Sequence, residues 1–159
     1  MRNMPHPDDR FLLSKAMMAR LKRIVPGGSH TYAKGDDQFP ERAPGLLARG
    51  RGCRVWDLDG NEFIEYGMGL RSVTLGHAEP RVVEAVAASL SLGTNFTRPS
   101  VKELEGSEAF LEVVRGAEMV KFTKDGSSAV TAAVKLARKY TGRSLVAVAS
   151  DHPFFSYDD

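Results

Sequence analysis

The sequence predicts an α/β fold in which an antiparallel sheet precedes the start of a mainly parallel one. Residues 118–122 form a short apolar run, and a helical spacing of apolar side chains begins at Ser127 after a glycine turn. Residues 145–149 are continuously apolar, which is typical of a strand buried on both faces. The order strand, helix, strand predicts a βαβ unit with parallel strands. Residues 46–66 carry instead the pattern of an antiparallel meander.

Composition places the chain among ordinary globular proteins. Its 159 residues are 42% hydrophobic and 26% charged, with a formal net charge of +2. Basic and acidic side chains are interspersed, so no basic stripe indicates a nucleic-acid partner. The single cysteine, Cys53, excludes an intrachain disulfide and favours a reducing compartment. Because the N-terminal region has no long apolar run, we expect a soluble, cytoplasmic protein without a membrane partner.

The first elements are expected to be a helix and a long loop. Residues 8–24 predict the helix, because acidic side chains lie at its start and basic ones near its end. The Pro-Gly-Gly sequence at 26–28 ends it. Residues 29–44 lack periodicity, and loops of this length are often functional. Three side chains of the loop could line a site or could equally be ordinary surface residues, namely His30, Tyr32 and Lys34.

The meander is expected to have strand-like residues 53–56 and 63–66 on either side of a turn. Asp57 and Asp59 lie in that turn. Two aspartates at this spacing could indicate a calcium loop, but the remaining ligand positions of an EF-hand are absent from the sequence. We therefore interpret both as turn-forming residues and expect no metal site.

Two helices are expected between the meander and the βαβ unit. Pro80 suits the first turn of a helix that runs to about Leu92 and ends at Gly93. Ser100 and Glu103 form a capping-box pattern that opens the next helix. The apolar face of the first of these helices is expected to point inward, with Val82, Val83, Val86 and Leu90.

The turn at residues 125–127 has the composition of an anion site. Ser127 or Asp125 can cap the helix that begins here, whose first N–H groups have no acceptor inside the helix. Those N–H groups and the helix dipole favour a phosphate, although an ordinary capped helix is the alternative. Ligands of parallel sheets gather beyond the carboxyl ends of the strands, where residues 152–155 are also expected.

Five motifs occur in a fixed order along the chain. They are residues 26–28 (PGG), 57–66 (DLDGNEFIEY), 75–80 (LGHAEP), 117–122 (AEMVKF) and 135–143 (KLARKYTGR). As an ordered set they resemble the class-III aminotransferases, which use pyridoxal 5'-phosphate (PLP). Within that family the likeness is strongest to the glutamate-1-semialdehyde 2,1-aminomutase branch. The resemblance covers the chain from about residue 22 onward.

The resemblance implies the N-terminal part of a fold-type I PLP-dependent transferase. It implies an N-terminal helical segment (1–25), a loop and antiparallel meander of the small domain (26–78), and an incomplete start of the large PLP-binding domain (79–159). In the family, the lysine that holds the cofactor and the aspartate that pairs with its ring lie beyond the matched region. We therefore assign no catalytic residue to this chain.

The resemblance also implies a set of cofactor contacts. The family usually has Ser-Gly-Thr-Glu-Ala where this chain has residues 125–129. The N–H groups of Gly126 and Ser127 and the Ser127 hydroxyl would hold the PLP phosphate. Ser128 belongs to the same cofactor-binding turn but replaces the usual glutamate. The aromatic ring that stacks on the cofactor would come from Phe154 or Phe155.

Two cationic residues are implied to bind the substrate. Lys34 stands near the position of an arginine that binds a carboxylate in the aminomutases, and a lysine offers a point charge in place of a two-pronged donor. Arg71 lies where those enzymes carry Ser-Trp-Gly. Both departures favour a different small amine or amino acid as substrate.

The sequence thus predicts the N-terminal portion of a PLP-dependent aminotransferase or aminomutase, which moves an amino group between an amine donor and a carbonyl compound. The full-length enzyme is expected to be a homodimer, and this chain alone is expected to be inactive. The alternative is a truncated, non-catalytic binding or dimerisation module. A phosphate-binding α/β domain outside this family is a further alternative, which the motifs away from the turn disfavour.

Overall fold

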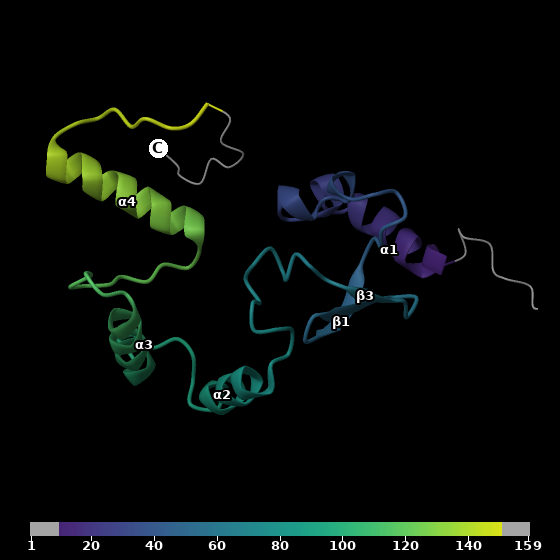
Figure 1. Ribbon diagram of the computed structural model, residues 1–159, viewed down its shortest axis with the longest axis horizontal. Coiled ribbons are helices and arrows are strands. Elements are labelled where there is room, and N and C mark those ends of the chain that lie inside the picture. Colours follow the sequence, from purple (N-terminus) through teal and green to yellow (C-terminus); the bar gives the residue numbers. More distant parts are fainter. Residues whose placement is uncertain (1–9, 151–159) are drawn as a thin grey trace, which may run out of the picture. The chain divides into compact units, whose positions relative to one another are not determined.

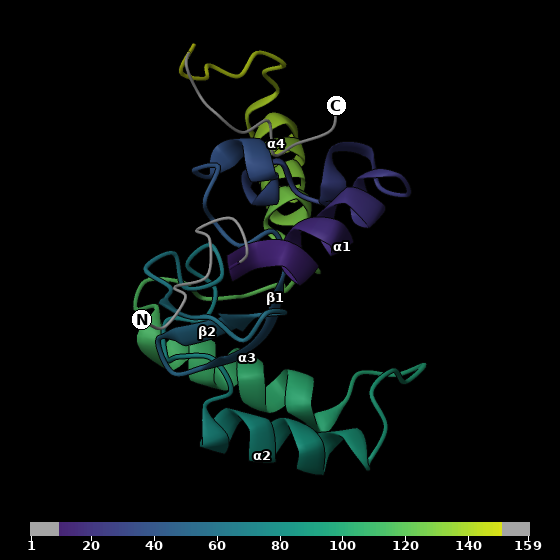
Figure 2. The same ribbon diagram turned by 90° about the vertical axis from the view of Figure 1, so that its right-hand side faces the viewer.

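The structure, a computed structural model, describes residues 10–150 and divides into two compact units, residues 1–94 and 95–159 (Figure 1, Figure 2). The elements are α1 (Leu12–Lys22), three short 3-10 helices η2 (Pro26–Gly28), η3 (Tyr32–Lys34) and η4 (Asp36–Gln38), β1 (Leu47–Arg51), β2 (Arg54–Asp57), β3 (Glu62–Ile64), α2 (Pro80–Leu90), α3 (Val101–Val113) and α4 (Gly126–Thr141). Among the described residues, no helix is long and apolar enough to span a membrane.

The sheet of the first unit is an antiparallel meander in the order β1-β2-β3, as the sequence predicts. Val55 of β2 pairs with Phe63 of β3 on one side and with Gly50 of β1 on the other. The turn between β2 and β3 forms around Asp57, whose buried carboxylate accepts hydrogen bonds from the N–H groups of Asp59 and Asn61 at 3.0 and 2.8 Å. The interpretation of Asp57 as a turn-forming residue is confirmed.

Helix α1 is fixed to this turn by hydrogen bonds and by a small core. The Asp59 carboxylate accepts from the N–H groups of Leu13 and Ser14, both at 2.8 Å, and so caps the start of the helix. The Phe11 and Phe63 rings stack with their centroids 6.2 Å apart. The buried apolar side chains of the described part of the chain are Phe11, Met18 and Val55. The core of the first unit therefore lies between α1 and the meander.

Helix α2 begins at Pro80, as predicted, and the Glu79 carboxylate caps it by accepting from the Val82 N–H at 2.9 Å. The expectation that its apolar face points inward is wrong. Val82, Val83, Val86 and Leu90 are 48–59% exposed. Apolar spacing identifies the face that a neighbouring layer would cover, but no layer within residues 10–150 buries it.

The described part of the second unit, residues 95–150, contains α3 and α4, whose ends follow from local sequence chemistry. The predicted capping box is present at α3. The Ser100 side chain accepts a hydrogen bond from the Glu103 N–H, and the Glu103 carboxylate accepts one from the Ser100 N–H. Helix α4 ends at Gly142, which has a φ of 68° and donates its N–H to the Arg138 carbonyl at 2.9 Å. Sequence and structure agree at both helices.

The two strands predicted at residues 118–122 and 145–149 are absent from the structure, so the expected βαβ pairing is not formed within residues 10–150. Met119 is 88% exposed and Leu145 is 93% exposed. A strand buried on both faces needs a hydrogen-bonded neighbour and a covering layer on each side. The two apolar runs have the composition of buried strands, but no described segment supplies the hydrogen-bonded neighbours or the covering layers.

Candidate functional site

The N-terminal turn of α4 lines a shallow depression of about 450 Å³. The depression is bordered by Asp125, Ser127, Ser128, Thr131, Ala132 and Lys135. Gly126 and Ser127 are the first two residues of the helix, where backbone N–H groups have no acceptor within the helix. A Cβ added at Gly126 would meet no atom within 4 Å, so its backbone is open to a ligand. The turn that the sequence marked as an anion site is therefore accessible.

Asp125 is the cap of α4, which decides between the two candidates that the sequence left open. Its carboxylate accepts from the Ser128 N–H at 2.7 Å. Hydrogen bonds from the Ser128 N–H and hydroxyl, together with the Lys124 charge and the Ser127 N–H, hold the pKa of Asp125 below its usual value, against a small opposing effect of burial. Within residues 10–150, the Gly126 N–H and the Ser127 hydroxyl take no part in this cap.

The arrangement separates two roles in one turn. Asp125 and Ser128 stabilise the start of the helix, while Ser127 borders a depression that Lys135 also lines. Donors of this kind at a helix N-terminus suit a phosphate group, because the dipole and the free N–H groups both favour an anion. The Asp125 charge opposes such an anion, and the positive charges of Lys124 and Lys135 offset it in part.

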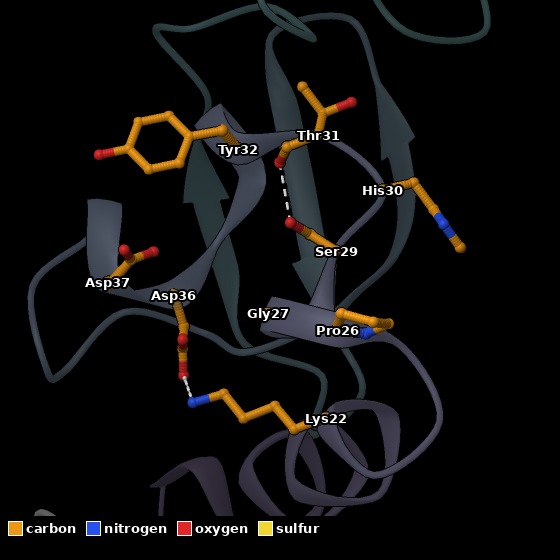
Figure 3. A pocket seen from close by; sticks show the side chains of 9 residues that line it. All are labelled: Lys22, Pro26, Gly27, Ser29, His30, Thr31, Tyr32, Asp36 and Asp37. Carbon is orange, nitrogen blue, oxygen red and sulfur yellow. Dashed lines mark hydrogen bonds and ion pairs between the residues drawn. The ribbon is translucent and has the colours of Figure 1, made fainter.

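A second depression, of about 600 Å³, lies in the loop after α1 (Figure 3). It is lined by Lys22, Pro26, Gly27, Ser29, His30, Thr31, Tyr32, Asp36 and Asp37. Figure 3 shows the His30 and Tyr32 side chains pointing to opposite sides of the loop. Two of the three loop residues proposed from the sequence thus line a depression, and the third, Lys34, does not.

Lys34 lies near Glu65 instead, and this carboxylate connects it to the segment that carries Arg71. Burial alone would raise the pKa of Glu65, but hydrogen bonds from His77 and from the Gly69 N–H, together with the positive charges of His77 and Lys34, hold it below its usual value. Glu65 accepts from the Gly69 N–H at 3.1 Å. The Lys34 charge and the Gly69 N–H therefore both act on one carboxylate.

Sequence analysis did not identify Glu65 or His77 as functional residues. Both lie in motifs that carry the family resemblance, at residues 57–66 and 75–80. Their pairing depends on a fold that brings together residues 12 positions apart, which no local pattern indicates. Of the other predicted site residues, Phe154 and Phe155 lie outside the described residues.

The comparisons with known proteins agree on one family. The family model "Aminotransferase class-III" matches residues 33–150. The glutamate-1-semialdehyde 2,1-aminomutase of Methanothermobacter thermautotrophicus is 40% identical over 133 residues, which are 84% of this chain and 31% of that protein. An omega-transaminase from Sphaerobacter thermophilus superimposes with a TM-score of 0.74 at 34% identity, over 82% of this chain and 29% of that one. A transaminase with PLP bound gives a TM-score of 0.74 at 38% identity, over 82% and 30% of the two chains.

The fold and these matches define the N-terminal part of a fold-type I PLP-dependent enzyme. The chain belongs to the class-III aminotransferase family, whose members depend on PLP. It is similar to glutamate-1-semialdehyde 2,1-aminomutases at 33–40% identity and spans about 31% of the length of these relatives. The predictions of family, fold class and cofactor are thereby confirmed.

Proposed function

We propose that the protein containing this chain is a PLP-dependent aminotransferase or aminomutase, and that this chain supplies the seat for the cofactor phosphate. The single observation that carries the proposal is the open turn at the start of α4, where Ser127 borders a depression in a chain of this family. The amino group would move between an amine or amino acid and a carbonyl compound.

The donors of the α4 turn fit a phosphate. The Gly126 N–H and the Ser127 hydroxyl, which take no part in the Asp125 cap, can each donate a hydrogen bond, and bonds to a charged acceptor are stronger than neutral ones. Ser128 acts on the same turn by donating its N–H to the Asp125 carboxylate at 2.7 Å. When bound, PLP supplies the electron sink that amino transfer requires. The residues described above bind and orient the cofactor through its phosphate.

The remaining contacts of the proposal come from other parts of the chain. Phe154 or Phe155 would place an aromatic ring against the cofactor. Lys34 and Arg71 would bind an anionic group of the substrate, with Lys34 acting as a point charge. Within this chain we assign no residue that exchanges protons with the substrate, so residues 1–159 alone are expected to be inactive.

The proposed assembly is a cytoplasmic homodimer, with the boundaries of the helical segment, the small domain and the large domain at residues 25/26 and 78/79. The single cysteine supports a reducing compartment, and Cys53 is free and exposed.

The exposed apolar face of α2 favours a second candidate function, a non-catalytic module that binds another polypeptide. PLP binding separates the two candidates, because a binding module has no need of the cofactor.

The substitution Ser127→Ala tests the proposal, with Ser128→Ala as the matched control. In the purified protein that contains this chain, S127A should weaken PLP binding about tenfold or more, the expected cost of one hydrogen bond to a charged group. S128A should change PLP affinity less than S127A, because its hydroxyl bonds to Asp125. Titration with PLP, followed by visible absorbance, measures both dissociation constants. Equal losses in the two variants, or a wild-type protein that binds no PLP, would contradict the proposal.

A further inference from the structure

The segment between the meander and α2 forms a strap, which we define as residues 66–76. Both of its ends are fixed to the turn between β1 and β2. Gly52 exchanges two backbone hydrogen bonds with His77, each of 2.8 Å, and the Cys53 carbonyl accepts from the Glu65 N–H at 2.9 Å. The Glu65 carboxylate also contacts His77 Nε2, and we call these two side chains the Glu65–His77 pair. The chain therefore leaves the sheet at one member of the pair and returns to it at the other.

The strap has an unfavourable backbone conformation. Met68, Gly69, Leu70 and Arg71 have consecutive φ values of 41°, 59°, 56° and 72°, which lie in the left-handed region. L-residues other than glycine rarely adopt this region, so such a run persists only where other groups hold it. Burial does not hold it, because no residue from 66 to 76 is buried in the described part of the chain, and Leu70 is 45% exposed.

Polar contacts support the strap instead. Within it, the Arg71 N–H donates to the Gly67 carbonyl at 2.8 Å. From outside it, Glu65 Oε1 accepts from the Gly69 N–H at 3.1 Å. The Glu65 carboxylate thus bonds to the left-handed run with one oxygen and to His77 with the other.

The pair itself is fixed to the sheet. A Cβ added at Gly50 would lie 2.6 Å from the His77 ring, so the ring lies directly against the backbone of β1. The two side chains are largely shielded from solvent, with 23% of Glu65 and 22% of His77 exposed. The pair therefore connects a packed part of the sheet to an exposed segment with a strained backbone.

We propose that the strap has two conformations, the closed one seen here and an open one, and that the Glu65–His77 pair is the switch between them. Without the carboxylate, the Gly69 N–H loses its acceptor, and without the imidazole the carboxylate loses the contact that orients it. The left-handed run then relaxes to backbone angles that L-residues favour. The switch goes beyond the proposed function, since it requires neither the cofactor nor the substrate.

Amide hydrogen exchange tests the switch in the full protein that contains this chain. Glu65→Ala and His77→Ala should each speed exchange of the Gly69 and Arg71 N–H groups about tenfold or more, the fold-change expected for loss of one hydrogen bond to a charged group. Exchange in the β1-β2-β3 meander should stay unchanged. Glu65→Gln should have a smaller effect, because its amide oxygen can still accept from Gly69.

Glu62→Ala is the matched control, because Glu62 lies on β3 and forms an exposed ion pair with Arg54. It should leave exchange in the strap at the wild-type rate. Limited digestion with trypsin gives a second measurement, since Arg71 is exposed and trypsin cleaves after arginine. Cleavage after Arg71, followed by mass spectrometry, should be faster in E65A and H77A than in the wild type or E62A.

Acid should open the strap of the wild type. Burial alone would raise the pKa of Glu65, but hydrogen bonds from His77 and the Gly69 N–H, together with the charges of His77 and Lys34, hold it below its usual value. Such a carboxylate stabilises the closed strap above its usual pKa and loses this effect as the pH falls through the lowered value. Exchange of the Gly69 N–H, corrected for its intrinsic rate, should therefore rise in acid, and much less so in E65Q.

Two outcomes would overturn the inference. In the first, the strap of E65A and H77A exchanges and is cleaved at wild-type rates, so that the pair does not hold it. In the second, the strap and the meander lose protection equally, so that the strap is not a separate switch. Neither outcome bears on the proposed function, which PLP titration tests separately.

Discussion

Asp59 illustrates how much a single side chain can do in this molecule. It lies in the turn between β2 and β3, yet its carboxylate accepts two hydrogen bonds of 2.8 Å from the start of α1, 45 and 46 residues earlier in the chain. Next to it, Asn61 exchanges hydrogen bonds with Arg10, of 3.0 Å between Arg10 Nε and Asn61 Oδ1 and of 2.7 Å between Asn61 Nδ2 and the Arg10 carbonyl. One turn therefore fixes the position of a helix.

Replacing Asp59 by Ala should destabilise the protein. The N–H groups of Leu13 and Ser14 would lose their acceptor, and loss of a helix cap costs about 1–2 kcal/mol. Denaturant unfolding followed by circular dichroism measures the change in the free energy of unfolding. Asp59→Asn is the control, because it keeps one acceptor oxygen and should show a smaller loss. Wild-type stability in D59A would show that the cap contributes nothing.

At this scale the sequence predicts local roles better than distant ones. Asp57 could be predicted as a turn-forming residue because its partners, Asp59 and Asn61, lie within four residues. The capping role of Asp59 could not, because its partners lie in another element. The same holds for Glu65, which meets His77 only after the chain has folded back.

At the scale of the element, two glycines show how the same residue serves opposite purposes. Gly106 lies inside α3, and a Cβ added there would meet no atom within 4 Å. Gly142 ends α4 with a φ of 68°, a conformation that costs other L-residues energy. The first glycine weakens its helix, and the second makes its end possible.

Alanine at these two positions should have effects of opposite sign. Gly106→Ala should stabilise the protein by about 0.5–1 kcal/mol, because alanine loses less backbone entropy in a helix. Gly142→Ala should destabilise it by roughly 1 kcal/mol, because the left-handed conformation is strained for alanine. The melting temperatures of the two variants, measured under identical conditions, check both. Shifts in the same direction would contradict this account of the two glycines.

The helices could be predicted from sequence more fully than the strands. The ends of α3 and α4 depend on Ser100, Glu103, Asp125 and Gly142, each of which acts on its own neighbours. Residues 118–122 and 145–149 carry apolar runs typical of buried strands, but a strand exists only with a hydrogen-bonded partner. The β1-β2-β3 meander succeeds because its partners follow one another directly in the chain.

At the scale of the whole molecule, the two units contribute different parts of the proposed enzyme. Residues 1–94 contain Lys34 and Arg71, and residues 95–159 contain the turn of α4. The start of α4 could be predicted from sequence because a helix start is a local feature. The contact between Glu65 and His77 could not, because the two residues lie 12 positions apart and meet only in the folded chain.

The central claim is that the start of α4 holds the phosphate of PLP, and the most direct test compares PLP with pyridoxal, which lacks the phosphate. The measurement is the dissociation constant of each compound for the protein that contains this chain, in the wild type and in S127A. We predict that the wild type binds PLP at least about tenfold more tightly, since several charged hydrogen bonds depend on the phosphate. S127A should weaken PLP and leave pyridoxal unchanged. Equal binding of the two compounds by the wild type, or equal weakening of both by S127A, would contradict the account.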